Sequence, residues 1–416
     1  MKLFALAALI AAQLLYASDA DLPPDGNVNS RYKVESVELS KAIDKRISRH
    51  LRERVDSLVG NNFDPQMVSD LATRIRKELR VVVSHRVERG QQPEYVKVVF
   101  DARERRWDEK DAEVTNLAYH QKQGWTGAIE MGFDAGANRF EFGFGSDADR
   151  LIERFAGVTA GYSRRFGEYV RLNFDFDTFH QQWNPATQFA LASRPDVPGI
   201  YRERYSMEPT LDFLITPELS LSVGVSIQHF QTQFPAARFE AANAVVTTLR
   251  HRRRWRPTDS AAGHELDAGY SLRAATRSLD SDFVYARHAV DASYSVRYSR
   301  HLVSARGGTG SISGSAPLYE RFSLGDTRTL RGWNKFDVDP LGGSRVAYGS
   351  VGYRYRAIGV FYDTGAVWDR NEKADTKHSA GVTVASGALH DGPYLTVAFP
   401  LRGGTFTPMF MLGMNF

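Results

Sequence analysis

The stretch that decides the fold is YERFSLGDTRTLRGW, which runs from Tyr319 to Trp333. It lies between two segments in which polar and apolar residues alternate, and it is too polar, and too rich in glycine and arginine, to continue either of them. We interpret it as a long loop that folds back into the lumen of a membrane β-barrel. This interpretation requires that the chain on both sides of the loop forms the barrel.

From Val114 to the end, the chain has a period of two. In 170–177 and 219–228, for example, apolar residues occupy every second position and polar or charged residues fill the positions between them. A soluble β-sandwich alternates in the same way, but here the connections tend to alternate between short and long. Tight turns on one side and longer loops on the other are typical of outer-membrane barrels.

The sequence therefore predicts a mainly β fold, with a transmembrane antiparallel β-barrel of about sixteen strands over 114–416. The predicted strands are 114–121, 125–133, 137–146, 153–165, 167–178, 203–215, 218–230, 240–254, 263–277, 284–298, 301–313, 345–355, 357–366, 377–387, 392–399 and 408–416. Tight periplasmic turns are predicted at 134–136, 166–167, 216–217 and 299–300, and long outer loops at 179–202 and 314–344. The first strand, VTNLAYHQ, is short and weakly apolar.

The N-terminus predicts export. In residues 1–20 one Lys precedes an apolar run, and the small-x-small site Ser18-Asp19-Ala20 follows it, as in a secretory signal peptide. After a polar linker at 21–30, no apolar run reaches the roughly 18 to 20 residues that a membrane helix needs, so the pattern excludes a helical membrane protein. We expect a Gram-negative-type outer-membrane location.

Composition limits the chemistry. The 34 glycines, 18 tyrosines and 25 phenylalanines suit strands and aromatic girdles. The absence of cysteine excludes a disulfide framework and a thiolate zinc site. A net charge of +4 on 416 residues is mild, and we predict no nucleic-acid partner.

Residues 31–104 predict a small α+β domain of order β-α-α-β-β, followed by a linker at 105–113. The strands are 32–39, 81–87 and 95–102, and Asp64-Pro65 marks the start of the second helix. The apolar positions that share a helix face are Ile43, Ile47, Leu51, Val55 and Leu58 in the first helix and Met67, Leu71, Ile75 and Leu79 in the second. The order resembles a POTRA domain, which implies a periplasmic module that docks extended polypeptides at its sheet edge.

The last strand carries a second signal. Phe410, Gly413 and the terminal Phe416 belong to an apolar strand that ends the chain on an aromatic residue. This pattern resembles the assembly signal of outer-membrane barrels.

The loop motif, FYDTG at Phe361–Gly365 and the Phe-terminated last strand together resemble the bacterial surface antigen superfamily of BamA/TamA-type assembly and two-partner secretion barrels. The resemblance implies that the loop enters the barrel and that its arginine contacts an acidic residue of the wall. The implied loop residues are Arg331, Gly332 and Trp333, with Gly325 and Glu320 earlier in the loop, and the implied wall residues are Asp363, Phe361 and Gly365.

The alternation supports this pairing independently. Ile358, Val360 and Tyr362 share one face, so Phe361 and Asp363 point to the lumen, where Asp363 can form a bidentate pair with an arginine. Two positions depart from the superfamily pattern. Gly325-Asp326 stands where a double glycine is common, and Gly352 stands where a glutamate is common, which removes one possible second partner for Arg331.

The basic run RHRRRWR, 250–256, is predicted to be a solvated rim at the periplasmic end of the eighth strand, with phosphate binding to lipid headgroups as the alternative. An arginine near the bilayer midplane would cost about 2–4 kcal/mol. The glycine cluster at 307–314 lacks a phosphate-loop lysine and is predicted to be lumen-facing or bulged strand.

No enzyme motif is present, since the histidines are scattered and no Gly-x-Ser-x-Gly occurs. We predict no catalytic residue, metal or cofactor. The leading hypothesis is a barrel that assists insertion or translocation of polypeptides through a weak seam between its first and last strands. The alternatives are a two-partner secretion pore and a passive porin or structural surface protein. The expected partners are outer-membrane lipid, unfolded polypeptides at the POTRA edge and the seam, and periplasmic accessory proteins around a monomeric barrel.

Overall fold

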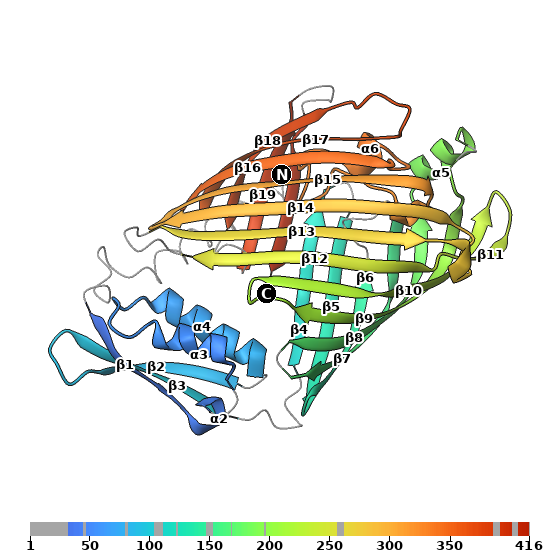
Figure 1. Cartoon of the computed structure of the whole chain (residues 1–416). Helices are drawn as coiled ribbons and strands as arrows, with labels where there is room; N and C mark the ends of the chain where they lie inside the picture. Colours follow the sequence, from blue (N-terminus) through green and yellow to red (C-terminus); the bar gives the residue numbers. More distant parts are fainter. Residues whose placement is uncertain are drawn as a thin grey trace. The chain divides into compact units, whose positions relative to one another are not determined.

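The computed structural model describes residues 32–44, 47–79, 82–103, 111–121, 124–146, 153–167, 169–194, 197–255, 262–385, 392–401 and 407–415. The chain divides into two compact units near Asp111 (Figure 1). The predicted signal peptide, the linker at 21–30, most of the linker at 105–113 and Phe416 lie outside the described residues. In the described part of the chain, no helix has the length and apolar character of a membrane span.

The first unit is a three-stranded sheet with helices. Its elements are β1 (Lys33–Leu39), α2 (Lys41–Asp44), α3 (Arg49–Asp56), α4 (Pro65–Leu79), β2 (Val82–Arg89) and β3 (Tyr95–Arg103). The strand order is β1-β3-β2, with β1 parallel and β2 antiparallel to β3, so both β1 and β2 are edges. A small α+β region of this kind was expected from the sequence.

Two details of this unit were predicted wrongly. The first helix is divided into α2 and α3, because Ser48 is extended and its hydroxyl accepts a hydrogen bond from the Leu51 amide as the N-cap of α3. In α4 Met67 is 44% exposed and the neighbouring Val68 is fully buried, so the buried face is rotated by one position at the start of the helix.

The second unit is a closed antiparallel barrel, in which β20 pairs with β4. Its strands are β4 (Asp111–His120), β5 (Gly124–Ala135), β6 (Asn138–Ser146), β7 (Glu153–Phe166), β8 (Val170–Trp183), β9 (Ile200–Leu214), β10 (Leu219–Phe234), β11 (Arg238–Ala241), β12 (Ala244–Trp255), β13 (Gly263–Ala275), β14 (Val284–Tyr298), β15 (His301–Ser315), β16 (Arg345–Tyr355), β17 (Ile358–Trp368), β18 (Lys377–Ala385), β19 (Gly392–Pro400) and β20 (Met409–Asn415). Within the described residues the four-residue β11 adds to sixteen long strands, which confirms the predicted fold class.

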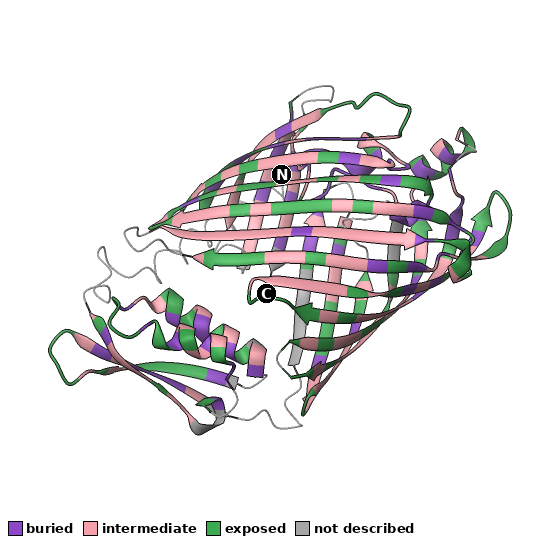
Figure 2. Cartoon of the chain, in the orientation of Figure 1, coloured by how far each residue is buried: buried purple, intermediate pink, exposed green. Residues whose placement is uncertain are grey.

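The barrel wall has its apolar side outward. On β10, Val223 and Val225 are each 38% exposed, whereas the lumenal Ser226 is fully buried and Gln228 nearly so. Exposed and half-buried positions alternate along the outer wall (Figure 2). A water-soluble sheet would bury the valines, so this inverted pattern indicates a wall that faces lipid.

The two ends of the barrel differ. At one end, which we call the short-turn end, the strands are joined by tight turns whose residues at positive φ are Gly136, Gly167, Ser299 and Arg356. At the other end, the loop end, the connections include α5 (Pro185–Ala192) and the long segment between β15 and β16. The predicted loop at 179–202 is shorter than expected, because β8 extends to Trp183 and α5 follows it directly.

Candidate functional site

The segment Ala316–Ser344, which we call the lumenal loop, is closed on itself. It contains a 3-10 turn, η3 (Leu318–Glu320), and the short helix α6 (Lys335–Val338). The amides of Phe322 and Gly343 each donate to the carbonyl of the other at 2.9 Å, and this bridge brings the two ends of the loop together. The loop therefore enters and leaves the barrel wall as one unit.

Apolar side chains of the lumenal loop form a core with the inner wall. The loop residues buried in this cluster are Ala316, Leu318, Tyr319, Phe322, Leu324, Leu330, Trp333, Phe336 and Leu341, and wall residues such as Trp183, Tyr201, Phe230 and Val367 pack against them. The loop motif was interpreted as too polar for a strand, but its leucines and several of its aromatic side chains are buried. The lumen near the loop end is consequently filled.

Arg331 and Asp363 form a bidentate ion pair in the lumen. Arg331 Nε donates to Asp363 Oδ2 at 2.8 Å and its Nη2 donates to Oδ1 at 2.7 Å, while the Arg331 backbone amide donates to Oδ2 at 3.0 Å. Asp363 is fully buried and the Arg331 side chain is 20% exposed. Opposite charges in this geometry make strong, directional hydrogen bonds.

Ser350 is the further partner that the sequence analysis missed. Its hydroxyl donates to Asp363 Oδ1 at 2.6 Å and accepts from Arg331 Nη2 at 3.1 Å. Ser350 lies directly opposite Asp363 in the register of β16 and β17. Gly352, where the superfamily often has glutamate, is on the same lumenal face two residues away, so alternation alone could have identified Ser350.

The neighbours of Arg331 fix it against the wall. Its guanidinium carbon lies 3.4 Å from the centre of the Phe361 ring. Gly332 has a φ of +92°, and a Cβ there would come within 3.1 Å of Ser379 Cβ, so only glycine fits this close approach. Trp333 Nε1 donates to the His378 carbonyl of β18 at 2.9 Å.

Gly325 and Gly365 make room for the loop. Gly325 has a φ of +99°, and its missing Cβ would lie 2.7 Å from the carbonyl carbon of Asn334. A Cβ on Gly365 would come within 2.9 Å of Leu324, which is buried. Asp326, the departure from a double glycine, accepts hydrogen bonds from the amides of Arg328 and Thr329 at 2.8 and 2.6 Å and so holds the turn before Arg331.

Glu320 contacts a different part of the wall from Arg331. Its carboxylate lies 3.3 Å from Arg273 Nε on β13 and 3.6 Å from Arg287 Nε on β14. Arg273 also donates to Glu208 on β9 at 2.8 Å. The lumenal loop thus has a second charged anchor at Glu320. The sequence had placed Glu320 in one set with Arg331.

A third set of ion pairs ties the loop end together. Asp369 Oδ2 accepts from Arg321 at 2.7 Å and from Arg194 at 2.8 Å, and the Ser344 amide donates to Asp369 Oδ1 at 2.9 Å. Burial alone would raise the pKa of the Asp369 carboxyl, but the hydrogen bond and charge of Arg321 lower that pKa from 3.8 to about 2. The cluster joins the segment after α5, the lumenal loop and the connection after β17.

The seam between β4 and β20 closes the barrel. In the described residues its register covers four pairs, from Met411 opposite His120 to Met414 opposite Leu117. Beyond them, the Gln121 amide donates to the Phe410 carbonyl at 3.1 Å. Gly413 is buried, and a Cβ there would collide with the Tyr394 ring on β19. The assembly-signal role of Phe410, Gly413 and Phe416 stays a prediction.

Among the described side chains, no group of three or more His, Asp or Glu residues is arranged to hold a metal ion. Arg331, Glu320 and Arg321 of the lumenal loop are each paired with a charged residue outside the loop, in the three anchors described above. This arrangement can hold a loop inside a barrel and fill one end of its lumen.

A closed barrel with an arginine-anchored lumenal loop defines a class of outer-membrane barrel. Residues 122–400 match the Omp85 superfamily domain. The match covers more than half of the chain, which therefore belongs to the Omp85 superfamily, as the resemblance implied.

Solved structures share this fold at low sequence identity. BamA from Haemophilus ducreyi lacking POTRA domains 1–3 is 15% identical with a TM-score of 0.58, over 93% of this chain and 85% of that chain. CdiB from Acinetobacter baumannii is 12% identical with a TM-score of 0.53, over 93% and 74%. CdiB from Escherichia coli is 12% identical with a TM-score of 0.51, over 93% and 77%. No curated protein sequence matches the chain.

Proposed function

We propose that this protein is an outer-membrane barrel that assists the insertion or translocation of other polypeptides, with its short-turn end and its small α+β unit in the periplasm. Membership of the Omp85 superfamily supports insertion or translocation in general. The short-turn end is assigned to the periplasm because tight turns are typical of that side.

The observation that carries the proposal is the β4–β20 seam. It joins the first and last strands of the barrel, and its described register runs from Met411 opposite His120 to Met414 opposite Leu117. Among the described residues these pairs form the ladder that an incoming strand would have to replace at this edge, so the seam is where we expect the barrel to open. The free edges β1 and β2 of the small unit offer a second surface for an extended chain.

The test is a disulfide that locks the seam. The chain has no cysteine, so Leu117→Cys with Met414→Cys introduces a single pair at facing positions. Oxidation should abolish substrate insertion or export, and reduction should restore it. The matched control is Val290→Cys with Thr309→Cys, facing positions in the long β14–β15 pairing. Full activity of the oxidised seam variant would contradict the proposal.

A dedicated secretion pore for one passenger is the second candidate, and the same barrel geometry supports it. Depletion of the protein separates the two. A fall in many outer-membrane barrels supports general assembly, and loss of one secreted product supports the dedicated pore.

A further inference from the structure

The basic run at the end of β12 is divided between the two faces of the wall. The lumenal arginines are paired with β13, since Arg250 and Arg252 donate to Asp267 at 2.7 and 3.0 Å and Arg254 lies 2.7 Å from Glu265. Arg253 lies between two of them, and alternation turns it to the outer face. Among the described residues no carboxylate pairs with Arg253.

Arg253 instead belongs to an aromatic cluster on the outer face. Its guanidinium carbon lies 5.4 Å from the centre of the Trp255 ring. Trp255 stacks on His264 at 5.2 Å, and His264 Nδ1 is hydrogen-bonded to the Tyr294 hydroxyl at 2.7 Å. Tryptophan and tyrosine gather where a membrane protein meets lipid headgroups. The cluster lies near the short-turn end of β12, which ends at Trp255.

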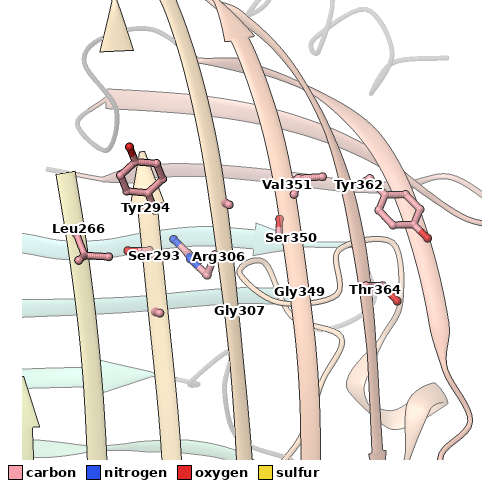
Figure 3. A pocket seen from close by; sticks show the side chains of 12 residues that line it. Leu266, Ser293, Tyr294, Arg306, Gly307, Gly349, Ser350, Val351, Tyr362 and Thr364 are labelled. Carbon is pink, nitrogen blue, oxygen red and sulfur yellow. The ribbon is translucent and has the colours of Figure 1, made fainter. Parts of the chain in front are cut away.

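A groove of about 490 Å³ runs across the outer face of β13–β17 next to this cluster (Figure 3). Its floor is a row of small residues that face one another in the register, Ala292, Gly307, Gly349 and Thr364. Tyr294 on β14 and Tyr362 on β17 also line it, each two residues along its strand from a member of this row. The glycine cluster at 307–314 was predicted to be lumen-facing or bulged strand. The pairing of β15 is regular on both sides, so no bulge occurs there and Gly307 faces outward, whereas Gly310 faces the lumen, where a Cβ would meet Phe322 of the loop.

The groove extends along the wall up to the position of Arg253. Arg253 faces Leu266 across β12 and β13, Leu266 faces Tyr294, and both Leu266 and Tyr294 line the groove. These facing residues form a second row, which begins at Arg253, two residues from the end of β12, and ends at Tyr362, four residues beyond the first residue of β17. Tyr362 therefore lies farther from the short-turn end than Arg253. Over five strand spacings the row extends roughly 24 Å. A positive charge therefore lies at the interfacial end of a shallow apolar groove.

We propose that this surface binds one anionic phospholipid, with the phosphate on the Arg253 guanidinium and an acyl chain in the groove. A guanidinium can donate two parallel hydrogen bonds to a phosphate. The hydrocarbon stem of Arg253 and the Trp255 ring are apolar parts of side chains with polar tips, which suits them to the boundary between lipid headgroups and acyl chains. The positive charge of Arg253 favours an anionic lipid, and the small residues of the groove floor leave space for one acyl chain. The inference rests on the membrane placement in the proposed function and not on polypeptide transport.

The test is native mass spectrometry of the full-length protein released from micelles with phosphatidylglycerol or phosphatidylcholine. The wild type should retain one phosphatidylglycerol in preference to phosphatidylcholine. Arg253→Gln should weaken that binding roughly fivefold. Gly349→Leu should weaken both lipids roughly tenfold by filling the groove. A Cβ on Gly349 meets no atom closer than 3.9 Å, so Gly349→Ala is a milder variant that preserves the wall.

The matched controls differ only in face or position. Arg252→Gln removes the same charge from the lumenal side, and Ala347→Leu adds the same bulk to β16 outside the groove. Equal lipid retention by the wild type, Arg253→Gln and Gly349→Leu overturns the inference, and so does an equal loss in Arg252→Gln. A protein dimer that Gly349→Leu abolishes would assign the groove to a second copy instead. Full transport activity of the oxidised seam variant, with lipid retention intact, would refute only the proposed function.

Discussion

At the scale of residues, the Arg331–Asp363 pair is the most constrained contact of the lumenal loop. The fully buried carboxylate receives bonds from the Arg331 side chain, the Arg331 amide and the Ser350 hydroxyl. Such a pair adds little net stability over an apolar contact, but removing one partner leaves the other charge buried and uncompensated. The pair therefore fixes where the loop lies.

Asp363→Asn should release the lumenal loop while the barrel stays folded. It removes the charge that neutralises Arg331, and breaking a buried pair costs about 3–5 kcal/mol. Limited trypsin digestion should then cleave within the loop, and heat-modifiable gel mobility should still report a folded barrel. Asp375→Asn is the control, because that side chain is 78% exposed. Unchanged protease resistance in Asp363→Asn would contradict the bracing role.

At this scale, the sequence predicts a residue correctly when its role depends only on which face of a strand it occupies. Asp363 and Phe361 are lumenal because a strand has a period of two, and Ser350 was equally accessible to the same argument. The partners of Glu320 could not be predicted in this way. Arg273 and Arg287 lie on β13 and β14, and only the path of the loop through the lumen brings them to Glu320.

At the scale of elements, the lumenal loop is held by three separate charged contacts around an apolar core. Arg331 binds β16 and β17, Glu320 binds β13 and β14, and Arg321 binds Asp369 beyond β17. The helix α5 adds Thr187, whose hydroxyl donates to the Pro340 carbonyl at 2.9 Å. Its N-cap Asn184 and first-turn Pro185 were visible in the sequence, but the surrounding residues had been assigned to a loop.

The cluster at Asp369 should make the loop end sensitive to acid. The pKa of Asp369 is lowered in the folded protein to about 2 from 3.8, so the charged carboxylate stabilises the fold above pH 4 by about 2 kcal/mol and this contribution is lost as the pH falls toward 2. The difference in unfolding free energy between wild type and Asp369→Asn should therefore shrink between pH 5 and pH 2, roughly in step with protonation. A difference that stayed constant with pH would remove the ion-pair explanation.

At the scale of the whole molecule, the barrel was predictable and its filling was not. Alternation and turns placed most strands within a few residues, because lipid on one side and a polar lumen on the other force a period of two. The loop core depends on contacts between residues far apart in sequence, such as Tyr319 with Tyr201 and Phe230. No local pattern records which side chains meet inside a closed wall.

The filled lumen predicts a barrel that conducts little. The wild type in planar bilayers should show small conductance, because the lumenal loop and its wall partners close the lumen near the loop end. Arg331→Ala combined with Glu320→Ala removes a loop charge from each of two separate anchors and should raise the conductance and the frequency of openings. Asp375→Asn again leaves the loop contacts in place. A large conductance in the wild type that the double variant does not change would identify a passive porin, since a pore of that kind needs an open lumen and no anchored loop.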